Sequence, residues 1–207
     1  MSLEAWLAFS LAAAIVLAIP GPTIMLVVGY ALGRGRETAW STVPGVALGD
    51  FTAMTASLVG LGALLATSAM LFTVLKWIGA AYLIWLGITL WRSKPEGLQP
   101  ERPEGGRDRW TMFAHSFAVT ALNPKSIVFF VAFLPQFIDH GAPLLPQFVT
   151  MEITFLVLAT LNAAIYAIAA GTLRTAAAKP SVLKIANRIG GSLLIGAGTL
   201  VAATPGK

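Results

Sequence analysis

The first long apolar stretch of the chain decides the fold: it runs from Ala5 to Gly33 and reads AWLAFSLAAAIVLAIPGPTIMLVVGYALG. It contains no charged side chain and is longer than the roughly 20 apolar residues that cross the hydrocarbon core of a bilayer. Pro20-Gly21-Pro22 interrupts it well inside the stretch. Because two prolines remove backbone donors and disrupt a helix, we predict a membrane-spanning helix that is broken at this point.

The rest of the chain has the same apolar character. Of the 207 residues, 57% are hydrophobic and 11% are charged, whereas a soluble domain carries about 25% charged residues. We therefore predict a single, all-α, polytopic integral membrane domain over residues 1–207, with six membrane-spanning helices. The predicted spans are residues 4–32, 40–66, 71–92, 111–138, 145–172 and 184–204. Five spans remain the alternative if the first or the last apolar stretch does not cross.

Lysine and arginine are concentrated in alternate connectors. The basic residues of the first, third and fifth connectors are Arg34, Arg36, Arg92, Lys94, Arg102, Arg107, Arg109, Arg174, Lys179, Lys184 and Arg188. The second connector has none before Lys76, and the fourth has none. By the positive-inside rule the odd connectors are cytoplasmic, which places both termini on the non-cytoplasmic side. We therefore interpret the net charge of +5 as a topology signal, and we expect no nucleic-acid partner.

The two halves of the chain share a pattern. An offset of 102 residues places Pro22 on Pro124 and Asp50 on Glu152. Both halves then contain a proline-broken first span, an acid early in the second span and a glycine-rich third span. This similarity predicts an internal repeat of three spans.

The repeat predicts a specific architecture. Repeat one covers about residues 1–92, a charged cytoplasmic linker covers 93–109, and repeat two covers about 110–207. Because three is an odd number, the second repeat must be inserted upside down relative to the first. Inverted repeats with broken helices are common in secondary transporters, which hold substrate near the midplane where the breaks meet.

A second interruption, Asn123-Pro124-Lys125, matches the first one. Lys125 is the one charge between Trp110 and Ile138. Charges inside a membrane are costly and usually face a partner or a watery cavity, so Lys125 is a candidate for binding a substrate carboxylate or an acid. The alternative is that the fourth span begins later and that Lys125 extends to the cytoplasmic surface.

Two acids and one amide are the remaining candidates for the site. Asp50 lies inside the second span, where a carboxylate can bind a substrate ammonium group or take up and release a proton. A structural ion pair with Lys125 is the alternative. Glu152 is a second candidate for proton coupling, although it lies nearer the outer end of the fifth span. Asn162 and Tyr166 share one helix face and offer hydrogen bonds to substrate or to neighbouring helices.

Other polar and small residues receive structural interpretations. Gly45 and Gly49 are expected to let helices approach closely. His115 and His140 are too isolated to predict a metal site, and the chain has no cysteine and no phosphate-binding glycine loop. We therefore expect no enzyme, no catalytic residue, no metal and no cofactor, and a gradient as the energy source.

The ordered motifs resemble the LysE/RhtB family of bacterial amino-acid exporters. The motifs are Pro20-Gly21-Pro22, GRGR at Gly33 to Arg36, PGVALGD at Pro44 to Asp50, Asn123-Pro124-Lys125 and FLPQF at Phe133 to Phe137. The resemblance extends over nearly the whole chain. It implies an inner-membrane exporter of amino acids or their derivatives, such as lysine, arginine, threonine, homoserine or homoserine lactone, coupled to the proton gradient. It also implies two broken-helix elements at the proline motifs and an intramembrane acid at Asp50.

The resulting hypothesis is a secondary transporter that exports a small zwitterionic or cationic amino acid. The substrate ammonium would meet Asp50, and the carboxylate would meet Lys125 or backbone amides exposed at the breaks. Its partners are the substrate, protons and the bilayer, and its small-residue pairs would permit a homodimer. Two alternatives stay open: an exporter of an inorganic cation, which needs several converging carboxylates, and a membrane assembly subunit that does not transport.

Overall fold

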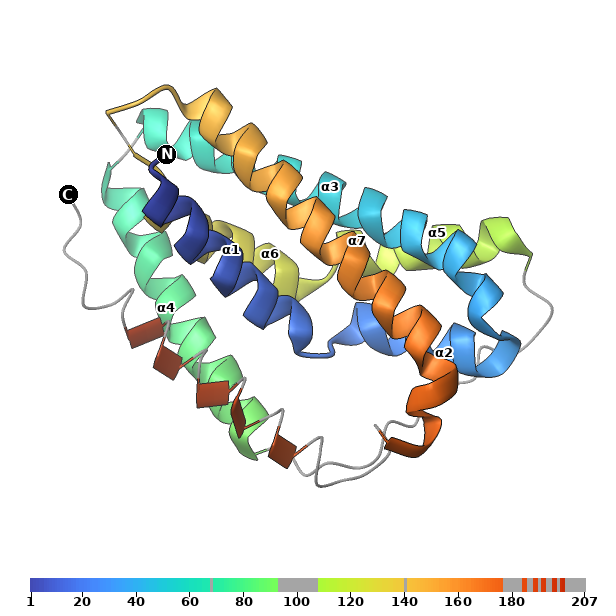
Figure 1. Ribbon diagram of the computed structural model, residues 1–207. Coiled ribbons are helices and arrows are strands. Elements are labelled where there is room, and N and C mark those ends of the chain that lie inside the picture. The colour runs from blue at the N-terminus through green and yellow to red at the C-terminus, as the bar shows by residue number, and fades with distance from the viewer. Residues whose placement is uncertain are drawn as a thin grey trace.

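The computed structural model describes residues 1–67, 69–92, 108–139 and 141–176, together with separate residues between 184 and 199. Its elements are helices, packed side by side in one bundle (Figure 1). In chain order they are α1 (Leu3–Ala18), α2 (Pro22–Arg34), the 3-10 helix η1 (Arg36–Thr38), α3 (Ala39–Thr67), α4 (Ala69–Arg92), α5 (Arg109–Ala121), α6 (Pro124–Phe133), the 3-10 helix η2 (Leu134–Phe137) and α7 (Leu144–Ala176).

The helices follow the predicted spans closely, and both predicted interruptions are present. The first and fourth predicted spans are each two helices, α1 with α2 and α5 with α6, bent by 51° and 42°. Within the described residues, Arg36–Ala63 and Leu144–Ala170 are long and apolar enough to cross a membrane alone, and each bent pair qualifies when taken as one span. The prediction of an all-α polytopic membrane protein is confirmed.

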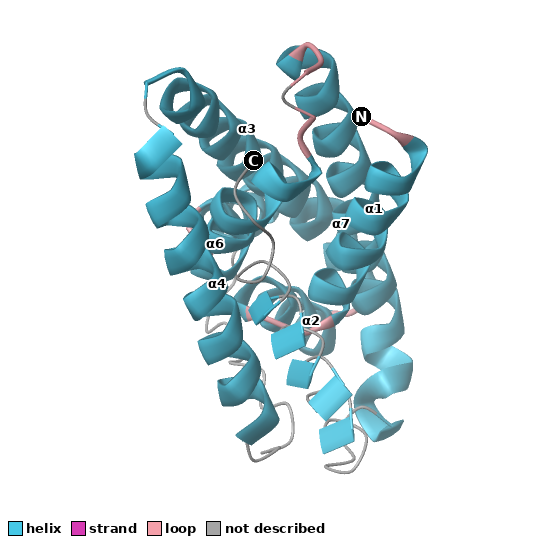
Figure 2. Cartoon of the chain, turned by 90° about the vertical axis from the view of Figure 1, so that its left-hand side faces the viewer, coloured by secondary structure: helices cyan, strands magenta, loops and turns pink. Residues whose placement is uncertain are grey.

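The two remaining predicted spans are seen in part. Helix α4 corresponds to the third span and contains a shorter apolar stretch, Ala80–Thr89. The sixth span, 184–204, is described at separate residues, and residues 93–107 of the predicted linker lie outside the described part of the chain. A methyl group on Gly191 would be 2.6 Å from the carbonyl oxygen of Gly87, and one on Gly198 would be 2.8 Å from that of Ala80. Gly191 and Gly198 therefore lie very close to α4 and in antiparallel order, and the described pieces of this segment lie beside α4 (Figure 1, Figure 2).

One face of α7 is apolar and exposed from Val149 to Ile168. The exposed side chains follow one another at intervals of three or four residues: Val149, Ile153, Val157, Leu161, Ile165 and Ile168. A stripe of this length would be unfavourable in water but is suited to lipid tails. The stripe therefore orients α7 with its small and polar residues toward the bundle.

The two halves of the bundle run in opposite senses. Figure 1 shows the pair α1 and α2 running against the pair α5 and α6, and α3 running against α7. This is the relation that inverted repeats require. The inverted repeat and its boundaries stay predictions from the sequence.

Helices α3 and α5 approach closely because α3 presents glycine to its partner. A methyl group on Gly45 would lie 2.5 Å from the carbonyl oxygen of Phe113, and one on Gly49 would lie 2.7 Å from the Cβ of Thr120. Side chains cannot fit at these distances, so both positions require glycine. The predicted packing role of these two glycines is confirmed, and the close contact at Gly49 fixes the position of Asp50, the next residue of α3.

The start of α5 is set by a capping side chain. The carboxylate of Asp108 accepts hydrogen bonds from the hydroxyl and the backbone amide of Thr111, at 2.7 and 2.8 Å. These hydrogen bonds lower the pKa of Asp108, since they stabilise its ionised form. Ser2 caps α1 in a similar way, by accepting a hydrogen bond from the amide of Ala5.

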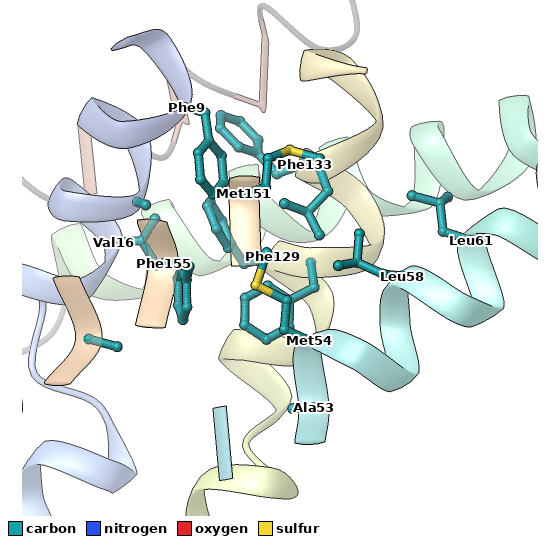
Figure 3. Close-up of a cluster of buried hydrophobic side chains, with 14 of the residues drawn as sticks. Phe9, Val16, Ala53, Met54, Leu58, Leu61, Phe129, Phe133, Met151 and Phe155 are labelled. Carbon is teal, nitrogen blue, oxygen red and sulfur yellow. The ribbon is translucent and has the colours of Figure 1, made fainter. Parts of the chain in front are cut away.

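Two apolar clusters lie on either side of the middle of the bundle. The larger one joins α1, α3, α6 and α7 through large side chains such as Phe9, Met54, Phe129 and Phe155 (Figure 3). The smaller one joins α2, the start of α3 and the second half of α7. Its buried members are Ile24, Val27, Val28, Ala31, Val46, Ala163, Ala167 and Ala170. The polar residues described next lie between these clusters.

Candidate functional site

The first helix break leaves carbonyl groups that the helix itself cannot satisfy. Helix α1 ends at Ala18, and α2 begins at Pro22 with Gly21 as its N-cap. In a continuous helix the carbonyl of Ala18 would accept a hydrogen bond from the amide of residue 22, which is a proline and has no N–H. In a membrane an unsatisfied carbonyl costs several kcal/mol, so another donor must be supplied.

Three side chains from the second half of the chain supply these donors. The amide nitrogen of Asn162 donates to the carbonyl oxygen of Leu17 at 3.0 Å, and the hydroxyl of Tyr166 donates to that of Ala18 at 3.0 Å. The ammonium of Lys125 donates to the carbonyl oxygen of Ile19 at 2.6 Å. The end of α1 is thus capped by α6 and α7.

The second break is built around Asn123. This residue is the N-cap of α6: its side-chain oxygen accepts the backbone amide of Lys125 at 3.0 Å, and Pro124 occupies the first helical position. Its side-chain amide donates to the hydroxyl of Thr23 at 3.1 Å. Thr120, on the last turn of α5, donates to the same hydroxyl oxygen at 3.2 Å. Thr23 therefore joins the two breaks.

Asp50 faces the same region from α3 and is 3% exposed. Its carboxylate accepts no hydrogen bond from the described residues and has no basic group of the described chain within ion-pair distance. Lys125 attracts it electrostatically without direct contact. The ion pair considered from the sequence is therefore not formed, because the Lys125 ammonium binds the Ile19 carbonyl instead.

These residues enclose a small cavity between the two apolar clusters. It is lined by Val16, Leu17, Gly21, Thr23, Ile24, Val46, Asp50, Asn123, Lys125, Ser126, Phe129, Phe155, Ala159 and Asn162. It leaves about 30 Å³ for the centres of water molecules. A single water needs about 10–15 Å³ on this measure, so the cavity has room for two or three waters and must widen to admit an amino acid.

The predicted site residues are brought together with one exception. Gly21, Asp50, Asn123, Lys125 and Asn162 line the cavity. Pro20, Pro22 and Pro124 shape the two breaks beside it. Lys125 does not extend to the membrane surface, since its ammonium is bound inside the bundle.

The exception is Glu152, which lies apart from the cavity. Its carboxylate accepts a hydrogen bond from the hydroxyl of Thr55, between α7 and α3. The repeat pattern paired Glu152 with Asp50, but Asn162 is the polar residue of α7 that lines the cavity. The predicted repeat pairs α3 with α7, but the residues of these two helices that face the cavity do not follow its offset of 102 residues.

Three polar contributors were missed from the sequence: Thr23, Thr120 and Ser126. Threonine and serine are common in membrane helices and often bond to their own backbone, so their presence alone carries little signal. The position of Thr23 directly after Pro22, and of Ser126 directly after Lys125, is the signal that would have found two of them. Among the described residues no three His, Cys, Asp or Glu side chains come together as a metal site would require.

Comparison with known proteins identifies relatives over nearly the full length. Residues 14–204 match the LysE type translocator family. The chain is 33% identical to an uncharacterized membrane protein of Vibrio cholerae and 32% identical to the homoserine/homoserine lactone efflux protein of Salmonella typhi, over 98% of both chains in each case. It is 32% identical to the leucine efflux protein of an Enterobacter species, over 69% of this chain and 64% of that protein. No solved structure matches the chain.

Proposed function

Because the chain belongs to the LysE type translocator family, we propose that it exports an amino acid or an amino-acid derivative across the bacterial inner membrane in exchange for protons. The observation that carries the proposal is Asp50, a buried carboxylate without a hydrogen-bond partner among the described residues, facing a cavity at two helix breaks. A desolvated carboxylate requires a cation or a proton. An exported ammonium group and an imported proton satisfy this requirement in turn.

The substrates named for the relatives support ammonium recognition at Asp50. Homoserine, homoserine lactone and leucine all carry an amino group, whereas the lactone has no free carboxylate. A site for this class of molecule must therefore recognise the ammonium and can do without the carboxylate. Asp50 provides the first contact, and Lys125 or backbone amides in the first turns of α2 and α6 provide the second for substrates that carry a carboxylate.

The transport cycle follows from the chemistry of the carboxylate. Facing the cytoplasm, Asp50 releases its proton and binds the substrate ammonium. Facing the other side, the ammonium leaves and Asp50 takes up a proton, so one proton enters for each substrate that leaves. The inward proton gradient sets the direction, and the predicted topology places both termini outside and the basic connectors inside. The two apolar clusters separate the cavity from either side of the membrane.

An inorganic cation is a poorer fit to this cavity. Asp50 is the one carboxylate among its lining residues, and Lys125 adds a positive charge. Hard divalent cations are bound by several oxygen ligands, often more than one of them a carboxylate. A cavity with one acid and one ammonium is better matched to a zwitterion.

The proposal is tested with the purified protein in proteoliposomes. Labelled homoserine, homoserine lactone and leucine are loaded inside, and their efflux is followed with and without an inward proton gradient. We expect gradient-driven efflux, and Asp50→Asn should reduce it at least about tenfold, since hydrogen bonds to charged groups contribute about 1.5–3 kcal/mol. Asp108→Asn is the matched control, because Asp108 is exposed at the start of α5.

Two results would contradict the proposal. Purified protein that moves none of these compounds under a proton gradient would favour the assembly subunit. Efflux by Asp50→Asn at the parent rate at every pH would remove the acid from the mechanism.

A further inference from the structure

The carbonyl groups at the C-terminal end of α1 attract a cation. The C-terminus of a helix carries about half a negative charge, concentrated on its last carbonyl groups. Two of these carbonyls, on Leu17 and Ala18, accept hydrogen bonds from the neutral groups of Asn162 and Tyr166. The next one, on Ile19, accepts a hydrogen bond from the ammonium of Lys125. A charged donor thus occupies the position nearest the break.

Asp50 adds a second source of negative potential to the same cavity. Its carboxylate faces the cavity and attracts the Lys125 ammonium, which remains bound to the Ile19 carbonyl. A cation at the cavity is therefore stabilised from two directions, by the helix end and by the acid. In other transporters with broken helices, carbonyl groups at such breaks coordinate the coupling cations. Here a side chain of the protein fills that role.

The Lys125 side chain lies where its ammonium can move away from the Ile19 carbonyl. A methyl group on Gly21 would be 3.4 Å from the Cδ and 3.6 Å from the Nζ of Lys125, so the side chain lies in ordinary contact over the first break. Its ammonium makes one hydrogen bond to the described residues, and its four-carbon stem can swing without moving α6.

We propose that Lys125 is a resident cation, which holds the position at the end of α1 until the substrate ammonium displaces it. This inference rests on the proposed function, because it assigns the substrate ammonium to the same position. Once displaced, the Lys125 ammonium lies free to bind the carboxylate of a substrate that has one. When the substrate leaves, Lys125 returns, so that the site carries a cation in both halves of the cycle and needs no sodium.

The test measures the stability of the purified protein in different salts, with no amino acid present. The parent should melt at the same temperature in sodium, lithium or choline chloride. Lys125→Met has nearly the same length and no charge, so it should melt at a lower temperature, and sodium or lithium should raise that temperature by about 3 °C or more in a saturable way, while choline should not. Lys125→Arg keeps the charge and should not respond to the salts.

The double variant Asp50→Asn/Lys125→Met is the matched control. It lacks both charges, so the response to small cations should disappear. In Lys125→Met, sodium should also raise the dissociation constant of the amino acid, because both cations compete for one position.

Each contrary result overturns the inference. A parent whose transport or stability depends on sodium, a Lys125→Met protein with no response to small cations, or a Lys125→Arg protein that does respond would each exclude a resident cation. If Lys125→Met does not fold, the parent and Lys125→Arg measurements decide. The melting measurements use no amino acid, so a failure of the proposed function, seen as a parent that transports none, is distinguished from a failure of this inference.

Discussion

Replacing Gly45 with alanine tests whether the close approach of α3 and α5 supports the site. The new methyl group would lie 2.5 Å from the carbonyl oxygen of Phe113 and 3.0 Å from the Cβ of Ser116. Ordinary contact begins at about 3.4 Å, so the two helices must separate locally by about 1 Å. Asp50 lies little more than one turn further along α3 and would move with it.

The size of the effect follows from two opposing contributions. Overpacking of this kind destabilises by about 1–3 kcal/mol. Alanine is a better helix former than glycine, and this difference stabilises the variant by about 0.5–1 kcal/mol. The net loss is about 1–2 kcal/mol, because the obstacle is backbone and cannot rotate away.

Gly60 provides a control on the same helix. A methyl group there has no heavy atom within 4 Å, so Gly60→Ala keeps the gain in helix propensity and meets no obstacle. We expect the melting temperature of Gly45→Ala in detergent to lie about 5 °C below that of Gly60→Ala, from about 2–4 °C per kcal/mol for a chain of this size. Amino-acid efflux should fall in Gly45→Ala alone. If Gly45→Ala and Gly60→Ala have the same melting temperature, the contact between α3 and α5 is not the constraint we describe.

Three further changes address the capping contacts and the second acid. Tyr166→Phe removes the hydroxyl that satisfies the Ala18 carbonyl, and the free energy of unfolding should fall by about 1 kcal/mol; an unchanged melting temperature would show that another donor replaces it. Thr23→Val removes the acceptor that joins the two breaks and should slow efflux, whereas Thr23→Ser should retain it; equal rates in both would argue against the link. Glu152→Gln retains the hydrogen bond with Thr55 but not the charge. If Glu152 carries protons, this change slows efflux driven by a proton gradient and spares exchange of internal for external substrate, and equal effects on both would exclude that role.

Much of the fold was predictable because a membrane imposes strict rules on a chain. The apolar spans, their order and both breaks follow from hydropathy and from proline, which cannot donate a backbone hydrogen bond wherever it stands. The bends at Pro22 and Pro124 therefore appear where the sequence placed them. Asp50 and Lys125 were found for a similar reason, since a charge deep in an apolar span is costly and usually marks a functional site.

The pairing of side chains was not predictable, because it depends on the rotation and depth of each helix. The sequence allowed an ion pair between Asp50 and Lys125, but the distance between them and the rival carbonyl of Ile19 are properties of the packed bundle. The repeat offset matched Glu152 to Asp50, yet α7 presents Asn162 to the cavity. A shift of a few residues along or around a helix is invisible to hydropathy and decides which residue faces the site.

The hydrogen bonds that satisfy the end of α1 and those made to Thr23 join the first half of the chain to the second. Leu17, Ala18 and Ile19 accept hydrogen bonds from Asn162, Tyr166 and Lys125, and Thr23 accepts them from Asn123 and Thr120. If access alternates because one repeat moves against the other, these five bonds are the ones that must break or exchange.

Hydrogen bonds between membrane helices contribute on average about 0.6 kcal/mol each, so together these five bonds hold the site closed by about 3 kcal/mol. A substrate that binds with a dissociation constant of 1 mM supplies about 4 kcal/mol. Millimolar affinity is therefore sufficient to open this site, and a much tighter substrate would be held in it, which is unfavourable for an exporter that must release its cargo.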